Sequence, residues 1–342
     1  MTEGFSSNIE SGLLNPILYK REEQAFRCNL PVSISLMQNL EPTKHIPVLL
    51  SEVVENLNAK DGGIFLDCTL GGGGHAEAIL KANPNNKVIA IDRDLRAIER
   101  AKIRLSAFED RLTIYHASFK ELSTILKNHQ FVGILADLGV STDQLKEGRG
   151  FSFNDEASLD MRMDESDGIT AFELINNASE TELFLILKKG GADKEASLAA
   201  KSIVNNRPIN SSKELSRIVN QGISRIVKTK STNPSTVVFQ AIRMAVNQEL
   251  QQIESFLEFA KEICIGRIAV ITFHSAEDKL VAATMRGWES GGAVSAASML
   301  PPGISFGKMV TKQGIEPSEE EVARNSASRS AKLRVFEVSN KR

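Results

Sequence analysis

Four consecutive glycines at residues 71–74 constrain the fold of this chain more than any other feature of its sequence. They follow the apolar run 64–70, which has the length and residue types of a buried strand, and they precede a helical pattern that begins at His75. Glycine tolerates the backbone angles of a tight turn and lets a ligand approach the main chain closely. A strand, a glycine turn and a helix in this order indicate a nucleotide-type site at the edge of a parallel sheet.

Apolar strand patterns alternate with amphipathic helix patterns on both sides of this turn. We expect further buried strands at residues 87–92, 112–115, 133–138, 266–273 and 333–338. The periodic apolar run from Val238 to Leu257 predicts one long helix, and residues 287–332, rich in Gly, Ser and Pro, indicate a long irregular excursion. Strands that alternate with helices favour parallel βαβ units in an α/β fold with a doubly wound, Rossmann-like sheet.

Residues 146–233 interrupt the alternation, because they contain no convincing strand pattern. Their charge is polarised: residues 147–182 contain ten acidic and two basic residues, whereas residues 186–230 contain ten basic and three acidic ones. We therefore predict a helical insertion in a chain with four segments: a mobile N-terminal extension at 1–44, two parts of the α/β domain at 45–145 and 234–342, and the insertion at 146–233.

The basic half of the insertion is a candidate contact surface for the phosphates of a nucleic acid. An ordinary solvated helix surface is the alternative. The basic side chains in question are Lys188, Lys189, Lys194, Lys201, Arg207, Arg217, Arg225, Lys228 and Lys230.

The overall composition is that of a soluble globular protein, with 42% apolar residues, 25% charged residues and a formal net charge of −2 over 342 residues. No apolar run approaches the roughly 20 residues that a membrane span requires. The three cysteines form no pair with the spacing of metal ligands. We expect a cytoplasmic protein that holds no metal and does not bind a membrane.

Carboxylates on both sides of the glycine turn suggest which nucleotide is bound. Asp92 ends the next predicted strand, where an acid can accept hydrogen bonds from both hydroxyls of a ribose. The spacing of Gly71, Gly73 and Ala76 still allows NAD. Asp67 favours S-adenosylmethionine, because a carboxylate before the turn suits an ammonium group and repels a pyrophosphate. A purely loop-bracing role is the alternative for Asp67.

Several longer stretches resemble one family, the bacterial 16S ribosomal RNA (cytosine-N4)-methyltransferases of the MraW/RsmH type. The stretches that carry the resemblance are His45-Ile-Pro-Val-Leu-Leu50, Asp67 to His75, Ala90-Ile-Asp-Arg-Asp94, Asp137-Leu-Gly-Val-Ser141, Arg149-Gly-Phe-Ser-Phe153, Leu159-Asp-Met-Arg-Met-Asp164, Phe239-Gln-Ala-Ile-Arg243, Phe273-His-Ser275 and Arg329-Ser-Ala-Lys-Leu-Arg334. The resemblance extends over about residues 45–340. The chain departs from the family pattern at Ser158, where the family usually has proline.

This resemblance implies a class I methyltransferase sheet with an inserted, mainly helical substrate-recognition domain. It implies S-adenosylmethionine as the cofactor, and methylation of the exocyclic N4 of a cytidine in the decoding (P-site) region of 16S rRNA within the small ribosomal subunit. The family's cofactor-binding positions fall on Gly73, Gly74, His75, Asp92, Phe119, Asp137 and Gln144. For the acceptor of the N4 proton, we expect the catalytic group to be Asp137 or the backbone carbonyl of Leu138 or Gly139.

Other functions stay open at this stage. A methyltransferase of the same fold acting on another nucleic acid or on a small molecule is one, and an RNA-binding ribosome assembly factor without turnover is another. His274, at the end of the strand predicted at 266–273, is either a structural helix cap or a catalytic group. The sequence also allows a homodimer.

Overall fold

The computed structural model describes residues 46–153, 155–156, 158–224, 235–291 and 305–339. The predicted N-terminal extension lies outside these residues. So do three members of the basic half of the insertion, Arg225, Lys228 and Lys230.

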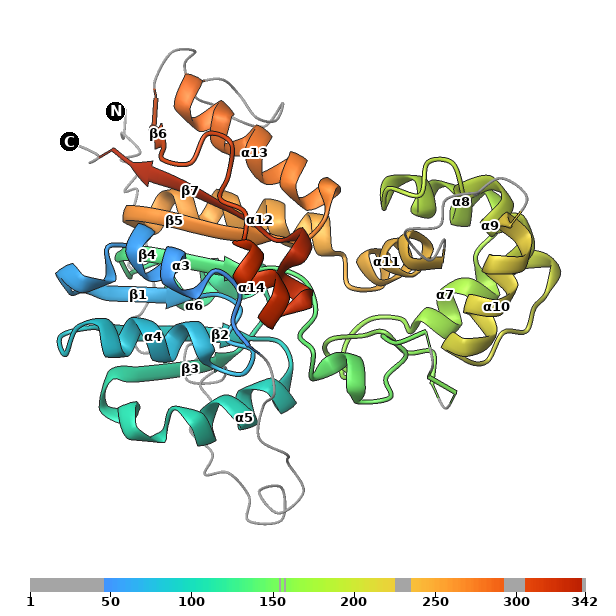
Figure 1. Ribbon diagram of the computed structural model, residues 1–342, viewed down its shortest axis with the longest axis horizontal. Coiled ribbons are helices and arrows are strands. Elements are labelled where there is room, and N and C mark those ends of the chain that lie inside the picture. Colours follow the sequence, from blue (N-terminus) through green and yellow to red (C-terminus); the bar gives the residue numbers. More distant parts are fainter. Residues whose placement is uncertain (1–45, 154, 157, 225–234, 292–304, 340–342) are drawn as a thin grey trace, which may run out of the picture.

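Within the described residues, the α/β part of the chain is built on a seven-stranded sheet with the order β3-β2-β1-β4-β5-β7-β6 (Figure 1). The strands are β1 (Ile64–Asp67), β2 (Lys87–Asp92), β3 (Leu112–His116), β4 (Phe131–Asp137), β5 (Cys264–Thr272), β6 (Gly307–Met309) and β7 (Lys332–Val338). Strands β1 to β5 are parallel, and β7 runs antiparallel to both β5 and β6. The predicted doubly wound sheet is confirmed.

Helices cover both faces of this sheet. Successive strand residues point to opposite faces, so Phe65 belongs to one apolar core and Leu66 to the other. The Phe65 core is covered by α3 (Leu50–Asn56), α4 (Gly74–Ala82) and α5 (Leu95–Arg104), and the Leu66 core by α6 (Leu122–Leu126), α12 (Glu249–Ile263) and α13 (Ser275–Ser290). Short 3₁₀ turns lie at Ala59–Asp61, Ser106–Arg111, Phe119–Glu121, Gln144–Lys146 and Ser326–Ser330.

A second group of helices lies beside the sheet, beyond the ends of the parallel strands (Figure 1). This helical module consists of α7 (Ala171–Asn177), α8 (Glu180–Lys189), α9 (Ala196–Asn205), α10 (Ser212–Ile223) and α11 (Ser235–Val246). It has its own apolar core, to which α11 contributes Val238 and Ile242. The described part of 146–233 contains no strand, and the change in packing falls after α11 rather than at residue 233.

The long helix expected over 238–257 is in fact two helices, α11 and α12, and the prediction is wrong at their junction. Gln248 has left-handed backbone angles, φ 50° and ψ 37°. The Asn247 side chain holds the break: its Nδ2 donates to the carbonyl of Met161 at 2.7 Å, and its Oδ1 accepts from the amide of Met163 at 2.8 Å. The break allows α11 to pack in the helical module while α12 packs on the sheet.

The described part of the C-terminal excursion contains regular elements that its composition does not predict. Residues 287–332 contain β6 and α14 (Glu319–Arg324), and α13 extends into their first residues. The carboxylate of Glu321 accepts a hydrogen bond from the amide of Leu49 at 2.8 Å, which ties α14 to the start of α3. None of the described helices is both long enough and apolar enough to cross a membrane.

Candidate cofactor pocket and active site

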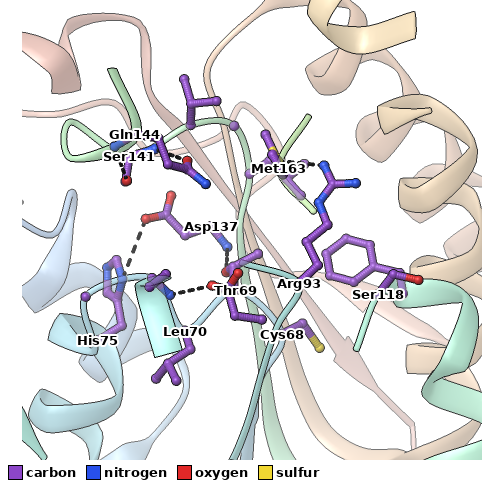
Figure 2. Close-up of a pocket in the computed structure, with 18 of the residues that line it drawn as sticks. Cys68, Thr69, Leu70, His75, Arg93, Ser118, Asp137, Ser141, Gln144 and Met163 are labelled. Atoms are coloured by element: carbon purple, nitrogen blue, oxygen red, sulfur yellow. Dashed lines mark hydrogen bonds and ion pairs between the residues drawn. The ribbon is translucent and has the colours of Figure 1, made fainter. Parts of the chain in front are cut away.

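A cavity with about 890 Å³ of empty space, part of it open to solvent, lies where β1, β2 and β4 end. The glycine turn, the segment after β3 and the loop after β4 also line it (Figure 2). The lining includes six of the seven cofactor-binding residues expected from the sequence, namely Gly74, His75, Asp92, Phe119, Asp137 and Gln144. Ligands of open α/β sheets collect at this edge.

Gly73, the seventh expected residue, does not line the cavity but shapes the turn from behind. It caps α4 with φ 79°, and a Cβ there would lie 3.0 Å from Leu105 Cδ1. A Cβ on Gly74 would lie 2.8 Å from Pro47 Cγ. The turn is closed by the amide of Gly71, which donates to Asp92 Oδ2 at 2.7 Å. These glycines therefore allow a close approach of main chain, side chains and ligand that larger residues would prevent.

His75 lies in the first turn of α4, between the glycine turn and the end of β4. Its Nε2 is 2.9 Å from the carbonyl of Val48, which can only accept, so Nε2 carries the proton. Its Nδ1 is 3.7 Å from Asp137 Oδ2 (Figure 2). The ring therefore faces the strand-end carboxyl across the pocket and belongs to the site rather than to the outer surface.

Burial raises the pKa of three carboxyl groups around the turn. The pKa of Asp92 rises to about 6, although the amides of Asp94 and Gly71 partly offset the effect of burial by donating to its carboxylate. The pKa of Asp67 rises to about 7, mainly because this side chain is fully buried. Burial raises the pKa of Asp137 well above its usual value, and the charges of Asp67 and Glu277 add to this effect.

Among the described residues, the buried Oδ1 of Asp137, in the wall of the pocket, has no hydrogen-bond partner, and neither does Oδ2 of Asp67 behind the turn. Unpaired carboxylate oxygens in a low-dielectric site are costly, and a cation relieves the cost. S-adenosylmethionine carries positive charge on its ammonium and sulfonium groups. The residues present therefore fit a cationic nucleoside far better than a pyrophosphate, which argues against NAD.

The expected direct contact between Asp67 and the cofactor is not supported by the geometry. Asp67 is fully buried behind the turn and does not line the cavity. Its Oδ1 accepts a hydrogen bond from the amide of Thr69 at 3.1 Å. Thr69 Oγ1 in turn accepts from the amide of Asp137 at 2.6 Å. The structure thus supports the loop-bracing role for Asp67. Its charge still affects the pocket without direct contact, because it contributes to the raised pKa of Asp137.

The raised pKa values predict a pH-dependent cofactor affinity. Near pH 5 the carboxyls of Asp67 and Asp92 are mostly protonated, and near pH 8 they are ionised. A cationic ligand binds the ionised forms better, so binding releases protons and the affinity for S-adenosylmethionine should rise by about tenfold or more across this interval. Calorimetric titration at a series of pH values measures this affinity. S-adenosylhomocysteine, which lacks the sulfonium charge, is the control and should show a weaker dependence; an affinity that falls with rising pH would contradict the assignment.

Gln144 and Phe119 complete the expected set. The Gln144 Nε2 donates to Asp94 Oδ2 at 2.8 Å, and its Oε1 accepts from the amide of Ser141 at 2.9 Å. The Phe119 ring lies 5.2 Å from that of Phe256, centroid to centroid. Gln144 therefore braces the loop after β4 against the start of α5, and Phe119 forms an aromatic wall of the cavity.

The lining residues that sequence reasoning missed include Arg93, Met163 and Gln252. Arg93 Nη1 donates to the carbonyl of Asn247 at 3.2 Å, and its Nη2 is 2.6 Å from Met163 Sδ (Figure 2). The position of Arg93 directly after the ribose acid was the available signal for it. Met163 comes from a segment distant in sequence, and only the fold brings it to the pocket.

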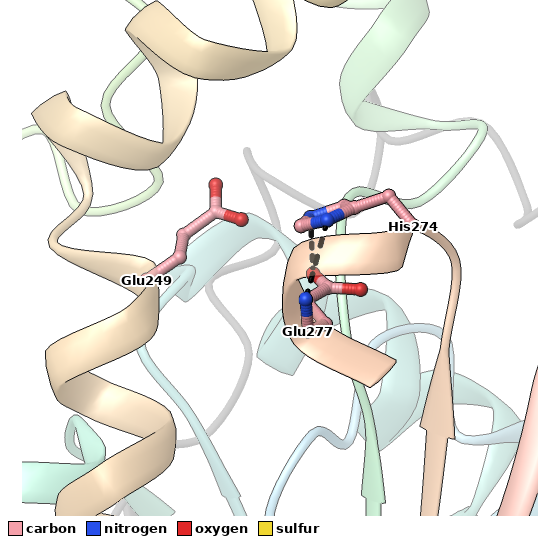
Figure 3. Close-up of side chains that lie close together, drawn as sticks. All are labelled: Glu249, His274 and Glu277. Atoms are coloured by element: carbon pink, nitrogen blue, oxygen red, sulfur yellow. Dashed lines mark hydrogen bonds and ion pairs between the residues drawn. The ribbon is translucent and has the colours of Figure 1, made fainter. Parts of the chain in front are cut away.

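A second cluster lies at the starts of α12 and α13, where Glu249, His274 and Glu277 converge (Figure 3). Both oxygens of Glu249 accept from Arg243, at 2.7 and 2.9 Å. His274 caps α13 by accepting from the amide of Glu277, and its Nε2 lies 2.9 Å from Glu277 Oε1. Glu249 therefore pairs with the guanidinium of Arg243, and Glu277 lies beside the imidazole of His274. These contacts support the structural role of His274 as a helix cap.

The strand order, the reversed β7 and a cation-suited pocket beside a strand-end acid define a Rossmann-like methyltransferase. The model of the MraW methylase family matches residues 42–339, and the chain belongs to this family. Family membership confirms that the protein is a methyltransferase and that S-adenosylmethionine is its cofactor.

Curated relatives match over nearly their whole length. The ribosomal RNA small subunit methyltransferase H of Sulfurihydrogenibium sp. (strain YO3AOP1) is 43% identical over 300 residues, which are 85% of this chain and 98% of the relative. The protein of the same name from Thermosipho melanesiensis is 44% identical over 302 residues, 86% of this chain and 97% of the relative. A solved rRNA methylase from Streptococcus thermophilus is 11% identical with a TM-score of 0.35, covering 85% of this chain and 93% of that one.

Proposed function

We propose that this protein methylates the exocyclic N4 of a cytidine in the decoding (P-site) region of 16S rRNA, acting on the small ribosomal subunit in the cytoplasm. The relatives named above are methyltransferases of small-subunit ribosomal RNA, which supports the class of substrate. The observation that carries the chemistry is the position of Asp137 at the end of β4, in the wall of the cofactor pocket.

The lining residues support one orientation of the cofactor. Asp92 accepts one main-chain hydrogen bond on each oxygen and keeps a lone pair on each for the ribose hydroxyls. Phe119 then lies beside the adenine. Gly74, His75 and Asp137 lie at the opposite end, toward the methionine and the transferred methyl group.

S-adenosylmethionine supplies a methyl group that is already electrophilic. The task of the chain is to hold the cytosine nitrogen in line with that group, and positioning alone can account for much of the rate. The N4 lone pair is delocalised into the ring, so an acceptor for the N4 proton makes the nitrogen a better nucleophile. A carboxylate whose pKa lies well above its usual value is a stronger base than an exposed one, and this suits Asp137 to the role.

The helical module supports the RNA side of the proposal. Lys188, Lys189, Lys194 and Lys201 are exposed on α8, α9 and the turn between them. Arg207 is a weaker candidate, because its guanidinium donates to the carbonyls of Ile175 and Ala178 at the end of α7. We infer that the four lysines contribute to phosphate binding and that Arg207 is structural.

The decisive experiment combines the protein and labelled S-adenosylmethionine with small ribosomal subunits from a strain that lacks the gene, followed by mapping of the label. Transfer to N4 of a decoding-region cytidine in 16S rRNA is the expected result. Label on protein, DNA or a small molecule would replace the RNA assignment. Binding without any transfer would favour an assembly factor that retains the cofactor fold.

A further inference from the structure

Gln252 is a polar side chain on the buried face of α12. It is 9% exposed, and its neighbours on this face of the helix, Ile253 and Phe256, belong to the apolar core. Gln252 nevertheless lines the cofactor cavity, and its buried Oε1 has no hydrogen-bond partner in the part of the chain that the structure describes. A buried carbonyl left unpaired is unfavourable, so a ligand that donates a hydrogen bond to it binds more tightly.

The place of Gln252 in the cavity follows from its helix. Residues four apart on a helix share a face, so Gln252 lies one turn before Phe256. Phe256 is the ring that packs against Phe119, and Lys120 Nζ donates to Gln248 Oε1 at 2.7 Å, which ties the segment after β3 to the start of α12. Gln252 therefore lies at the Phe119 end of the cavity, away from the His75 and Asp137 end.

The chemistry of a carboxamide matches one part of the cofactor. At this end the proposed orientation places the adenine, whose 6-amino group donates and whose ring nitrogens accept. A glutamine amide can donate and accept at once and can pair with such an edge through two hydrogen bonds. In the proposed orientation, Asp92 contacts the ribose, and the groups around Asp137 contact the methionine end. The adenine edge is therefore the part of the cofactor that remains for Gln252 to contact.

We propose that Gln252 recognises the adenine of the cofactor by accepting a hydrogen bond from its 6-amino group. This inference rests on the proposed orientation of the cofactor in the pocket. It makes Gln252 a specificity-determining residue for the nucleobase, whereas Phe119 provides only a non-selective aromatic surface.

The test compares the affinity for S-adenosylhomocysteine with that for its 6-deamino analogue, in which hydrogen replaces the amino group. The unmodified protein should prefer the amino form by about tenfold or more, as expected when a buried polar group loses its partner. In Gln252→Leu the preference should fall to below about threefold, because the oxygen that accepts from the 6-amino group is removed. Gln252→Glu should retain the preference, because its carboxyl oxygen still accepts a hydrogen bond from the amino group. Gln251→Leu, on the exposed face of the same helix, is the matched control.

A Gln252→Leu protein that keeps the full preference would overturn the inference, as would an unmodified protein that binds both ligands equally. Gln252→Met provides a second apolar variant if the leucine protein fails to fold. Failure of the unmodified protein to bind either ligand would instead overturn the proposed cofactor site itself, so the two failures are distinguishable.

Discussion

Asp137→Asn should lower the rate of methyl transfer by about 10²–10⁴-fold, the range that a positioned general base contributes. Asparagine has nearly the same shape, and the main-chain bond from residue 137 to Thr69 Oγ1 does not depend on the side chain. The amide cannot take up the N4 proton. Burial and the nearby charges of Asp67 and Glu277 raise the pKa of the Asp137 carboxyl, so its basic form is the more effective acceptor.

Single-turnover measurements at saturating cofactor separate this effect from cofactor binding. In the unmodified protein the rate should rise with pH as Asp137 ionises, and this rise should be absent in the variant. Asp110→Asn, an exposed carboxylate remote from the pocket, serves as the control and should leave the rate unchanged. A variant at residue 137 with an unaltered rate would transfer the acceptor role to the carbonyls of Leu138 and Gly139, which also line the pocket.

The sheet could be predicted because its strands are continuous apolar runs whose residues face cores on both sides. Residues 87–92 coincide with β2 for this reason. The junction at Asn247 could not be predicted, because the apolar spacing runs through it and the break depends on main-chain groups of Met161 and Met163. β6 escaped prediction since three residues carry too little periodicity to be detected.

The cofactor site was predictable where it follows local sequence and not where it depends on packing. Asp92 and Asp137 end strands, so their place at the edge of the sheet follows from the strand pattern. Phe119 and Gln144, which line the cavity, were predicted as site residues only through the family resemblance. Gln252 had one local signal, a polar residue beside Ile253 and Phe256 on the buried helix face, but that signal acquires meaning only when Gln252 is seen to line the pocket.

Arg149, the arginine of the Arg-Gly-Phe-Ser-Phe run, connects the insertion to Asp94, two residues after the proposed ribose-binding Asp92. Arg149 Nη2 donates to Asp94 and lies 2.7 Å from Glu147 Oε2. The guanidinium also lies over the ring of Phe151, with Cζ 5.5 Å from the ring centroid. Asp94 caps α5 and receives the Gln144 amide. These side chains are almost fully buried, so the charge of Asp94 depends on the guanidinium for compensation.

Arg149→Ala should therefore lower the free energy of unfolding by about 3–5 kcal/mol, the usual cost of removing one partner from a buried ion pair. The free energy of unfolding of Arg149→Lys should lie between those of the unmodified protein and Arg149→Ala, because an ammonium keeps the charge but cannot bridge two carboxylates in one plane. Arg162→Ala provides the matched control: its ion pair with Asp160 is partly exposed, and such pairs contribute about 1 kcal/mol or less. Urea unfolding measures all three variants.

Arg149→Ala should also weaken cofactor binding, because the main-chain amide of Asp94 donates a hydrogen bond to the Asp92 carboxylate. An alanine variant no less stable than Arg162→Ala would show that Asp94 is compensated without Arg149. If the predicted loss is found, the Arg149-Gly-Phe-Ser-Phe153 run has a physical explanation: it connects the start of the insertion to the residues that we propose for ribose binding, so that one buried network would position both RNA and cofactor.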